Sequence, residues 1–115
     1  MSNLLQCDYS VYLLDDSLQY ITKDYEPVKR KIVTAANRHR ESGVMLVGAR
    51  HWSPAMRQQC KAMNITSKDF EQGFIDQYDQ FITREDAMRI ALKNGQPLIR
   101  CPGADGNELF SENLH

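Results

Sequence analysis

A change of hydrophobic period at Thr83 constrains the fold of this chain more than any other feature of its sequence. Before it, Phe74, Tyr78 and Phe81 have a strand-compatible spacing around the polar segment DQYDQ, which predicts a hairpin. After it, apolar residues recur at the spacing of a helical face, until Gly95 ends the pattern. The chain therefore has to combine paired strands with helices.

The helix predicted from Thr83 carries clear start signals. The segment TRED resembles a capping box, with Asp86 in the place of the usual glutamate. The buried stripe of this helix is predicted to hold Ala87, Met88 and Ala91. The later segment LFSENLH has two apolar anchors, so we expect it to dock on the domain.

A second short helix is predicted from Ser53, a good N-cap, followed by Pro54 at the first helical position. Its buried side would carry Met56, Cys60 and Met63.

Two strands are predicted upstream of that helix, in the segment KIVTAANRHRESGVMLVGARH. The turn between them is assigned to ESG, where Gly43 can adopt a positive φ. The unbroken apolar run Val44–Val47 is typical of an interior strand that is covered on both faces. Gly48, which follows it, indicates a bulge or a close backbone approach.

The N-terminal part favours a helix over residues 10–24. Val11, Leu14, Leu18 and Ile21 are spaced by three, four and three residues, as on one helical face. The alternative is a strand through SVYLL. The chain as a whole is thus predicted to be α+β, with a small, mostly antiparallel sheet, short helices and an N-terminal helix. At 115 residues it forms a single domain, divided into an N-terminal helical segment, 1–30, and an α+β ligand-binding part, 31–115.

Composition excludes several classes of function. A net charge of −1 argues against DNA binding, which depends on neutralising many phosphates. Cys7, Cys60 and Cys101 are widely spaced and form no CxxC pair, so neither a zinc site nor a disulfide framework is expected. No leader sequence and no membrane-length apolar run is present, which favours a cytoplasmic protein without a membrane partner.

No catalytic, metal or cofactor site is predicted. The chain contains neither GxGxxG nor GK[ST], the two common nucleotide cradles. Its histidines are His39, His51 and His115, and none has a spacing typical of metal ligands. Cys60 with His51 is a conceivable nucleophile and base, but Cys60 falls on the buried side of its helix and is more simply a packed thiol.

Arginines and aromatic rings do gather at the ends of the predicted elements. An arginine at a helix N-terminus suits a phosphate, and a ring beside it suits a stacked base. Phe74 could instead be a core residue, and Arg84 in a first helical turn needs either a partner acid or an anion. The candidate ligand-binding residues are Phe74, Thr83, Arg84, Arg50, His51 and Arg100.

Four motifs together resemble a family of small bacteriophage proteins: GARH (48–51), EQGF (71–74), QFITREDAMRIALKNGQ (80–96) and LFSENL (109–114). The family is the first-described anti-Thoeris family, phage "sponges" that sequester signals of the cyclic ADP-ribose type. The resemblance covers residues 45–115 well and residues 1–30 poorly. One departure is Gln80, where the family usually has an arginine.

The resemblance implies a binding protein and not an enzyme. Such sponges hold a signalling nucleotide made by a defence protein with a TIR domain, are homo-oligomers built on dimers, and in some members also hold cyclic oligonucleotides. Carried over to this chain, Phe74 would stack on the base while Arg84 and Thr83 would hold the diphosphate, with Arg50, His51 and Arg100 as weaker candidates. Two alternatives remain open at this point: a small phage inhibitor that binds a host protein, and a nucleotide-cleaving enzyme.

Overall fold

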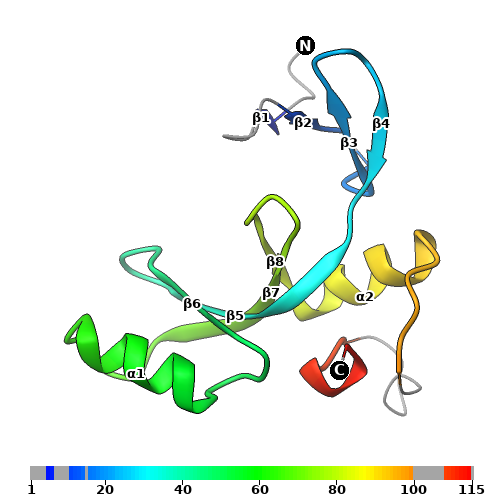
Figure 1. Ribbon diagram of the computed structural model, residues 1–115. Coiled ribbons are helices and arrows are strands. Elements are labelled where there is room, and N and C mark those ends of the chain that lie inside the picture. The colour runs from blue at the N-terminus through cyan, green and yellow to red at the C-terminus, as the bar shows by residue number, and fades with distance from the viewer. Residues whose placement is uncertain (1–4, 7–10, 15, 100–107, 115) are drawn as a thin grey trace.

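The computed structural model describes residues 5–6, 11–14, 16–99 and 108–114, and Cys7, Arg100, Cys101 and His115 lie outside these ranges. Two four-stranded antiparallel sheets and two α-helices make up the described part (Figure 1), which confirms the α+β class and the antiparallel pairing. The elements in chain order are β1 (Leu5–Gln6), β2 (Val11–Leu13), β3 (Gln19–Thr22), β4 (Pro27–Lys29), β5 (Ile32–His39), β6 (Met45–Gly48), α1 (Pro54–Ala62), β7 (Phe70–Asp76), β8 (Phe81–Thr83), α2 (Arg84–Lys93) and the short 3₁₀ turn η1 (Ser111–Asn113).

The predicted N-terminal helix over residues 10–24 is wrong, because β2 and β3 pair as an antiparallel hairpin there. The turn between them explains the difference. Ser17 adopts a positive φ of 59°, and the Asp16 carboxylate accepts a hydrogen bond from the backbone N–H of Leu18. This local turn interrupts any helix, and the helical spacing of the apolar residues is coincidental. The alternative through SVYLL was the better interpretation, and β1 to β4 form a sheet in sequential order.

The second sheet has the strand order β6-β5-β7-β8, so β5 and β7 are its interior strands. The interior position predicted for Val44–Val47 is therefore wrong: β6 is an edge strand, with Leu46 fully buried and Val47 37% exposed. The backbone of Val47, in the middle of this edge strand, is nevertheless hydrogen-bonded on its outer side. The Gln59 side chain of α1 accepts from the Val47 N–H at 3.0 Å and donates to the Val47 carbonyl at 2.7 Å. A side chain thus takes the place that a further strand would occupy.

Both helices contribute to one core on the same sheet. Met56 and Cys60 of α1 are buried there, whereas Met63 lies at the end of the helix and is exposed. The remaining buried members come from the sheet, from α2 and from the C-terminal segment: Ile32, Ala35, Leu46, Phe74, Ile82, Ala87, Met88, Ile90, Ala91 and Leu109. Leu109 confirms that this segment docks on the domain.

The sequence located both helix starts correctly. Ser53 and Thr83 are the N-caps of α1 and α2, and each side chain accepts a hydrogen bond from a backbone N–H of the first turn. Gly43 and Gly95 adopt positive φ values at the predicted turn and helix end. At Gly48 the backbone lies close to the Ser53 side chain, because a Cβ atom there would lie 2.6 Å from the Ser53 hydroxyl oxygen.

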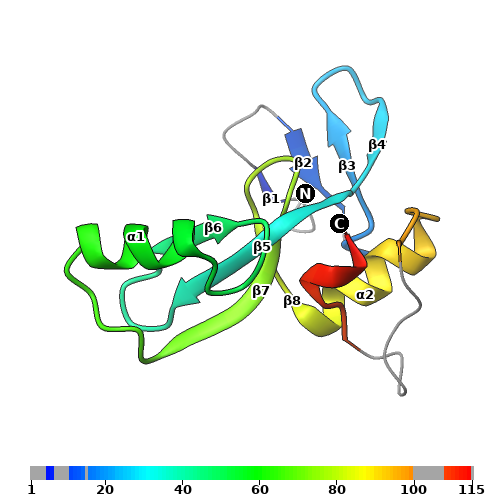
Figure 2. The ribbon, with the colours of Figure 1, turned by 60° about the horizontal axis from the view of Figure 1, so that its bottom comes forward.

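The chain passes from the first sheet to the second where β4 leads into β5 (Figure 2). A buried ionic network joins the two sheets at this point. Asp76, at the end of β7, accepts from Arg30 Nε at 2.8 Å and from the Tyr20 hydroxyl. Burial is the main reason that the pKa of Tyr20 is raised, followed by its hydrogen bond to Asp76, so the phenol remains a donor. All three side chains are buried, and this network fixes the N-terminal sheet to the second sheet.

Amide side chains reinforce the same junction. Asn94, just after α2, donates to the carbonyls of Leu18 and Arg30. Gln96 bonds both the N–H and the carbonyl of Ile32, and Gln77 bonds the backbone of Lys29 and Lys31. Because these partners are backbone groups, the junction is held in one register.

We predict that Asp76→Asn destabilises the fold strongly, by about 3–5 kcal/mol, because Arg30 would be left as a buried charge without its counter-ion. Denaturant unfolding should show a lower midpoint with an unchanged slope. The control is Glu41→Gln, an exposed carboxylate in the β5–β6 turn, for which a change within about 0.5 kcal/mol is expected. A loss of less than about 1 kcal/mol for Asp76→Asn would mean that the network acts like a surface ion pair.

Candidate functional site

The first residue of α2, Arg84, is the centre of the candidate site. Its side chain is partly buried, and Nη2 lies 3.3 Å from Nδ1 of His51. The guanidinium carbon lies 5.1 Å from the centre of the Phe110 ring, in a cation–π contact. The backbone supports this arrangement, since the Leu109 N–H donates to the Arg84 carbonyl at 3.1 Å. We call His51, Arg84, Phe110 and Arg50 the Arg84 cluster.

Arg84 has donor capacity that the described residues do not use. Its Nε is buried and has no hydrogen-bond partner in the part of the chain that the structure describes. Within the same residues no carboxylate lies within ion-pair distance of its guanidinium. A buried unsatisfied donor costs about 1–3 kcal/mol, and more when the group is charged. Of the two partners that the sequence allowed for Arg84, an acid or an anion, the described residues do not provide the acid.

His51 is held by both of its ring nitrogens. Nε2 donates to the Gly73 carbonyl at 2.7 Å, which leaves Nδ1 as the acceptor that faces Arg84. The ring also meets Phe74 edge-on, with centroids 5.2 Å apart. Burial, more than the nearby Arg84 charge, lowers the pKa of His51, while the bond to Gly73 and the charge of Glu112 act in the opposite direction. The imidazole is thus neutral at physiological pH.

Arg50 reaches the same C-terminal segment as Arg84. Its Nη1 donates to the carbonyl of Ala49 at 3.1 Å and to the carbonyl of Ser111 at 3.4 Å. Arg84 contacts Phe110, the neighbour of Ser111. The side chains of Arg50 and Arg84 therefore both contact the short stretch formed by Phe110 and Ser111.

Thr83 serves the helix and not the cluster, because its hydroxyl oxygen caps α2 by accepting from the Asp86 N–H at 3.2 Å. Glu85 and Asp86 follow in the first turn and already complement the helix dipole. The helix N-terminus is therefore a weaker anion cradle than its sequence indicated, and the positive charge comes from Arg84.

Phe74 is fully buried, so the structure leaves no face of its ring open for a base. Its place in the core, and its contact with His51, make it a support for the cluster. The ring that accompanies Arg84 is instead Phe110, which is 36% exposed. Sequence reasoning treated Phe110 only as a docking anchor. The available signal was its place in LFSENL, one of the motifs that carry the family resemblance.

The Cys60–His51 pair is not assembled. Cys60 Sγ donates to the Ile65 carbonyl at 2.9 Å, while His51 is bonded to Gly73 and Arg84. Among residues 5–6, 11–14, 16–99 and 108–114, no three His, Cys, Asp or Glu side chains lie together as metal ligands. In the same ranges no helix is long and apolar enough to span a bilayer.

We predict that stability falls on acidification partly through His51. Its folded pKa lies below the ordinary 6.5, so the unfolded chain takes up the proton first. The stabilising contribution of the neutral ring is complete above pH 6.5 and is lost as the pH falls towards the folded pKa. The loss is limited to about 1.4 kcal/mol per pH unit. Between about pH 7.5 and pH 5.5, the midpoint of thermal unfolding should therefore decrease more steeply with falling pH for wild type than for His51→Gln. Parallel curves would contradict this role.

Comparison with known proteins gives a family match. Residues 31–115 match the model of the family described as "Phage T4 y16D protein". No curated protein and no solved structure shows a significant match. The family match spans well over half of the chain, so the protein belongs to this bacteriophage family.

Proposed function

We propose that this phage protein binds a nucleotide second messenger of a bacterial defence response and sequesters it without hydrolysis. The messenger is of the cyclic ADP-ribose type or a cyclic oligonucleotide. Membership of a phage family supports the setting, and the resemblance of the motifs GARH, EQGF and LFSENL to anti-Thoeris sponges supports the class of ligand. The protein then acts in the cytoplasm of the infected host cell.

One observation carries this proposal: the half-buried Arg84 guanidinium, whose Nε has no acceptor among the described residues and which has no ion pair there. A diphosphate presents several charged oxygens, and arginine binds such groups through parallel, charge-assisted hydrogen bonds. A phosphate that reached this group would satisfy the missing bond and neutralise the charge together. Because Nε is covered, binding would need a small shift of the segment that carries Phe110.

Phe110 and Arg50 suit the other parts of such a ligand. The Phe110 ring is partly exposed beside the guanidinium, so a base can stack against it. Arg50 approaches the same segment through Ser111 and brings a second positive charge. Thr83 and Phe74 remain in the proposal as positioning residues, and Arg100 remains an untested candidate.

The hydrogen bonds of His51 support sequestration of the ligand and argue against a catalytic role for this histidine. Both ring nitrogens are engaged, by Gly73 and by Arg84, and a general base needs a nitrogen that faces the substrate. A sponge must also bind tightly, and nanomolar affinity corresponds to about −12 kcal/mol. That is demanding for a small ligand, so we propose that a second subunit adds contacts, within a homo-oligomer built on dimers.

We predict that Arg84→Ala weakens binding of cyclic ADP-ribose isomers by at least about tenfold, the loss of one charge-assisted contact. Calorimetric titration measures the affinity, and a melting curve recorded in parallel shows that the fold is kept. Arg84→Lys keeps the positive charge but removes the planar guanidinium with its parallel N–H donors, so this variant should bind with intermediate affinity. The control is Arg40→Ala, which removes an exposed arginine from the β5–β6 turn. Equal affinities for Arg84→Ala and wild type would place the ligand elsewhere.

The absence of turnover is a separate prediction. The protein is mixed with a cyclic ADP-ribose isomer until the free ligand disappears, then denatured by heat, and the released molecule is analysed by mass and chromatographic retention. We expect intact ligand in the amount that was bound. A cleaved or rearranged product would show an enzyme and would overturn the proposed sequestration.

A further inference from the structure

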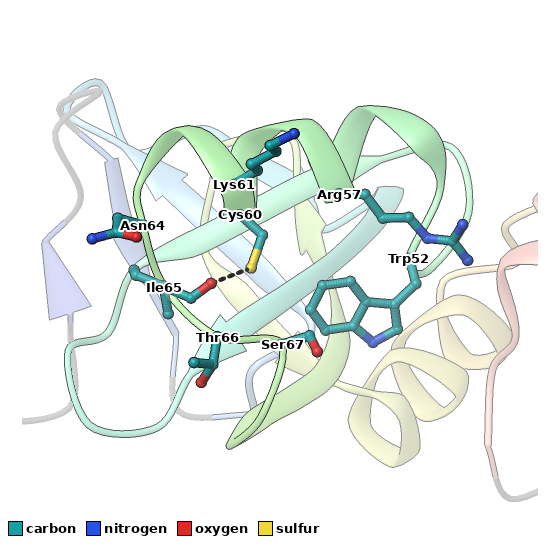
Figure 3. Close-up of a pocket in the computed structure, with 8 residues that line it drawn as sticks. All are labelled: Trp52, Arg57, Cys60, Lys61, Asn64, Ile65, Thr66 and Ser67. Carbon is teal, nitrogen blue, oxygen red and sulfur yellow. Dashed lines mark hydrogen bonds between the residues drawn. The ribbon is translucent and has the colours of Figure 1, made fainter.

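A concave surface lies on the other helix, between α1 and the loop that follows it. This α1 groove has a volume of about 710 Å³, which falls within the range of about 300–1,000 Å³ typical of small-molecule sites. Figure 3 shows α1 along one side, with Arg57 and Lys61, and the loop with Thr66 and Ser67 along the other. The indole of Trp52 lies at the end of the groove nearest Arg57.

The indole is fixed in place before any ligand arrives. The Asn37 amide, oriented to satisfy its own bonds, accepts from Trp52 Nε1 at 3.1 Å, and Asn37 is fully buried. Phe70 packs edge-on against the ring with centroids 5.2 Å apart. The backbone of Trp52 has a positive φ of 54°, a conformation that costs a residue with a side chain about 1 kcal/mol. Backbone strain of this kind occurs where a side chain has to be aimed in a particular direction.

The basic residues beside the indole have no acidic partner among the residues that the structure describes. Arg57 and Lys61 are four residues apart on α1, a spacing at which like charges repel, and the helix sequence PAMRQQCKA contains no acid. Both are exposed, and neither forms an ion pair within the described part of the chain. Thr66 and Ser67 line the opposite wall. A rigid ring, two exposed cations that form no ion pair in the described ranges, and the side chains of Thr66 and Ser67 thus share one groove.

We propose that the α1 groove is a binding site for a nucleoside phosphate, distinct from the Arg84 cluster. The indole stacks against the base, Arg57 and Lys61 bind the phosphate, and Thr66 or Ser67 bonds a ribose hydroxyl. Trp52 is only partly buried and lines the groove, so part of its ring is open to a ligand there. This inference does not depend on the function proposed for Arg84, since none of its residues belongs to that cluster.

The chain offers a direct probe of this site, because Trp52 is its only tryptophan. Indole fluorescence, excited at the red edge of its absorption, is followed during titration of the full-length protein with AMP, ADP, adenosine and inorganic pyrophosphate. We expect saturable quenching by AMP and ADP and much weaker quenching by adenosine. Pyrophosphate alone should not quench the fluorescence, because it contacts Arg57 and Lys61 and not the indole. It should nevertheless compete with ADP for these two side chains.

Variants separate this site from the first one. Arg57→Ala combined with Lys61→Ala should raise the dissociation constant for ADP at least about tenfold, because two charge-assisted contacts are lost. The charge-matched control is Arg40→Ala with Lys93→Ala, two exposed residues outside the groove, and it should leave quenching unchanged. Arg84→Ala should also leave it unchanged, even if it abolishes binding of cyclic ADP-ribose.

Three results would overturn the inference. The first is the absence of saturable quenching by any of the nucleotides at millimolar concentration. The second is quenching that both double variants reduce equally, which would show non-specific attraction by charge. The third is quenching by an acidic peptide in place of nucleotides, which would assign the groove to a protein partner.

Discussion

The buried carboxylate of Asp76 is the interaction on which the rest of the structure depends. Its two oxygens accept from four donors: the Tyr20 hydroxyl, Arg30 Nε and the backbone N–H groups of Tyr78 and Gln80. The first two belong to the N-terminal sheet and its exit, and the last two form the turn of the β7–β8 hairpin. A carboxylate is stable in such a place only when all of its bonds are made, so the packing of the two sheets and the shape of the turn are set together. The position at which α2 begins, Arg84, four residues after Gln80, follows from that turn.

Gly73 connects the β7–β8 hairpin to the Arg84 cluster. It pairs directly with Thr83, the residue before Arg84, and its carbonyl accepts from His51. A Cβ atom at this position would lie 2.3 Å from the Ile82 carbonyl oxygen and 2.5 Å from the Phe81 ring, so only glycine allows the strands and the ring to pack as they do. His51 and Arg84 therefore meet because both are attached to the same pair of backbone residues. The contact between His51 and Arg84 is therefore set by the pairing of β7 with β8.

Features encoded by a few neighbouring residues could be predicted from the sequence, and those set by distant ones could not. Ser53, Thr83, Gly43 and Gly95 mark helix ends and turns through their own side chains or φ angles, and all were placed correctly. The N-terminal hairpin was missed because Val11, Leu14, Leu18 and Ile21 match a helical period by coincidence, while the turn at Ser17 decides the outcome. The run Val44–Val47 could not reveal its edge position, because an apolar run does not specify which strands lie beside it. At the site, the need of Arg84 for a partner could be predicted from its position in the first turn of a helix. That Phe110 and not Phe74 is the partly exposed ring beside Arg84 depends on tertiary packing, which the sequence pattern does not specify.

The relation between the two proposed sites follows from one residue conformation. His51 and Trp52 are consecutive, yet His51 bonds Gly73 and Arg84, while Trp52 bonds Asn37 and lines the α1 groove. The positive φ at Trp52 allows this divergence, and its strain is balanced by the Asn37 bond, the Phe70 contact and the N–H contact with Met56 Sδ. Neither ring can reorient without breaking the hydrogen bonds that hold it. Because the two rings are held by separate partners and neither has to move when the other site is occupied, the two sites should bind independently and with nearly additive free energies.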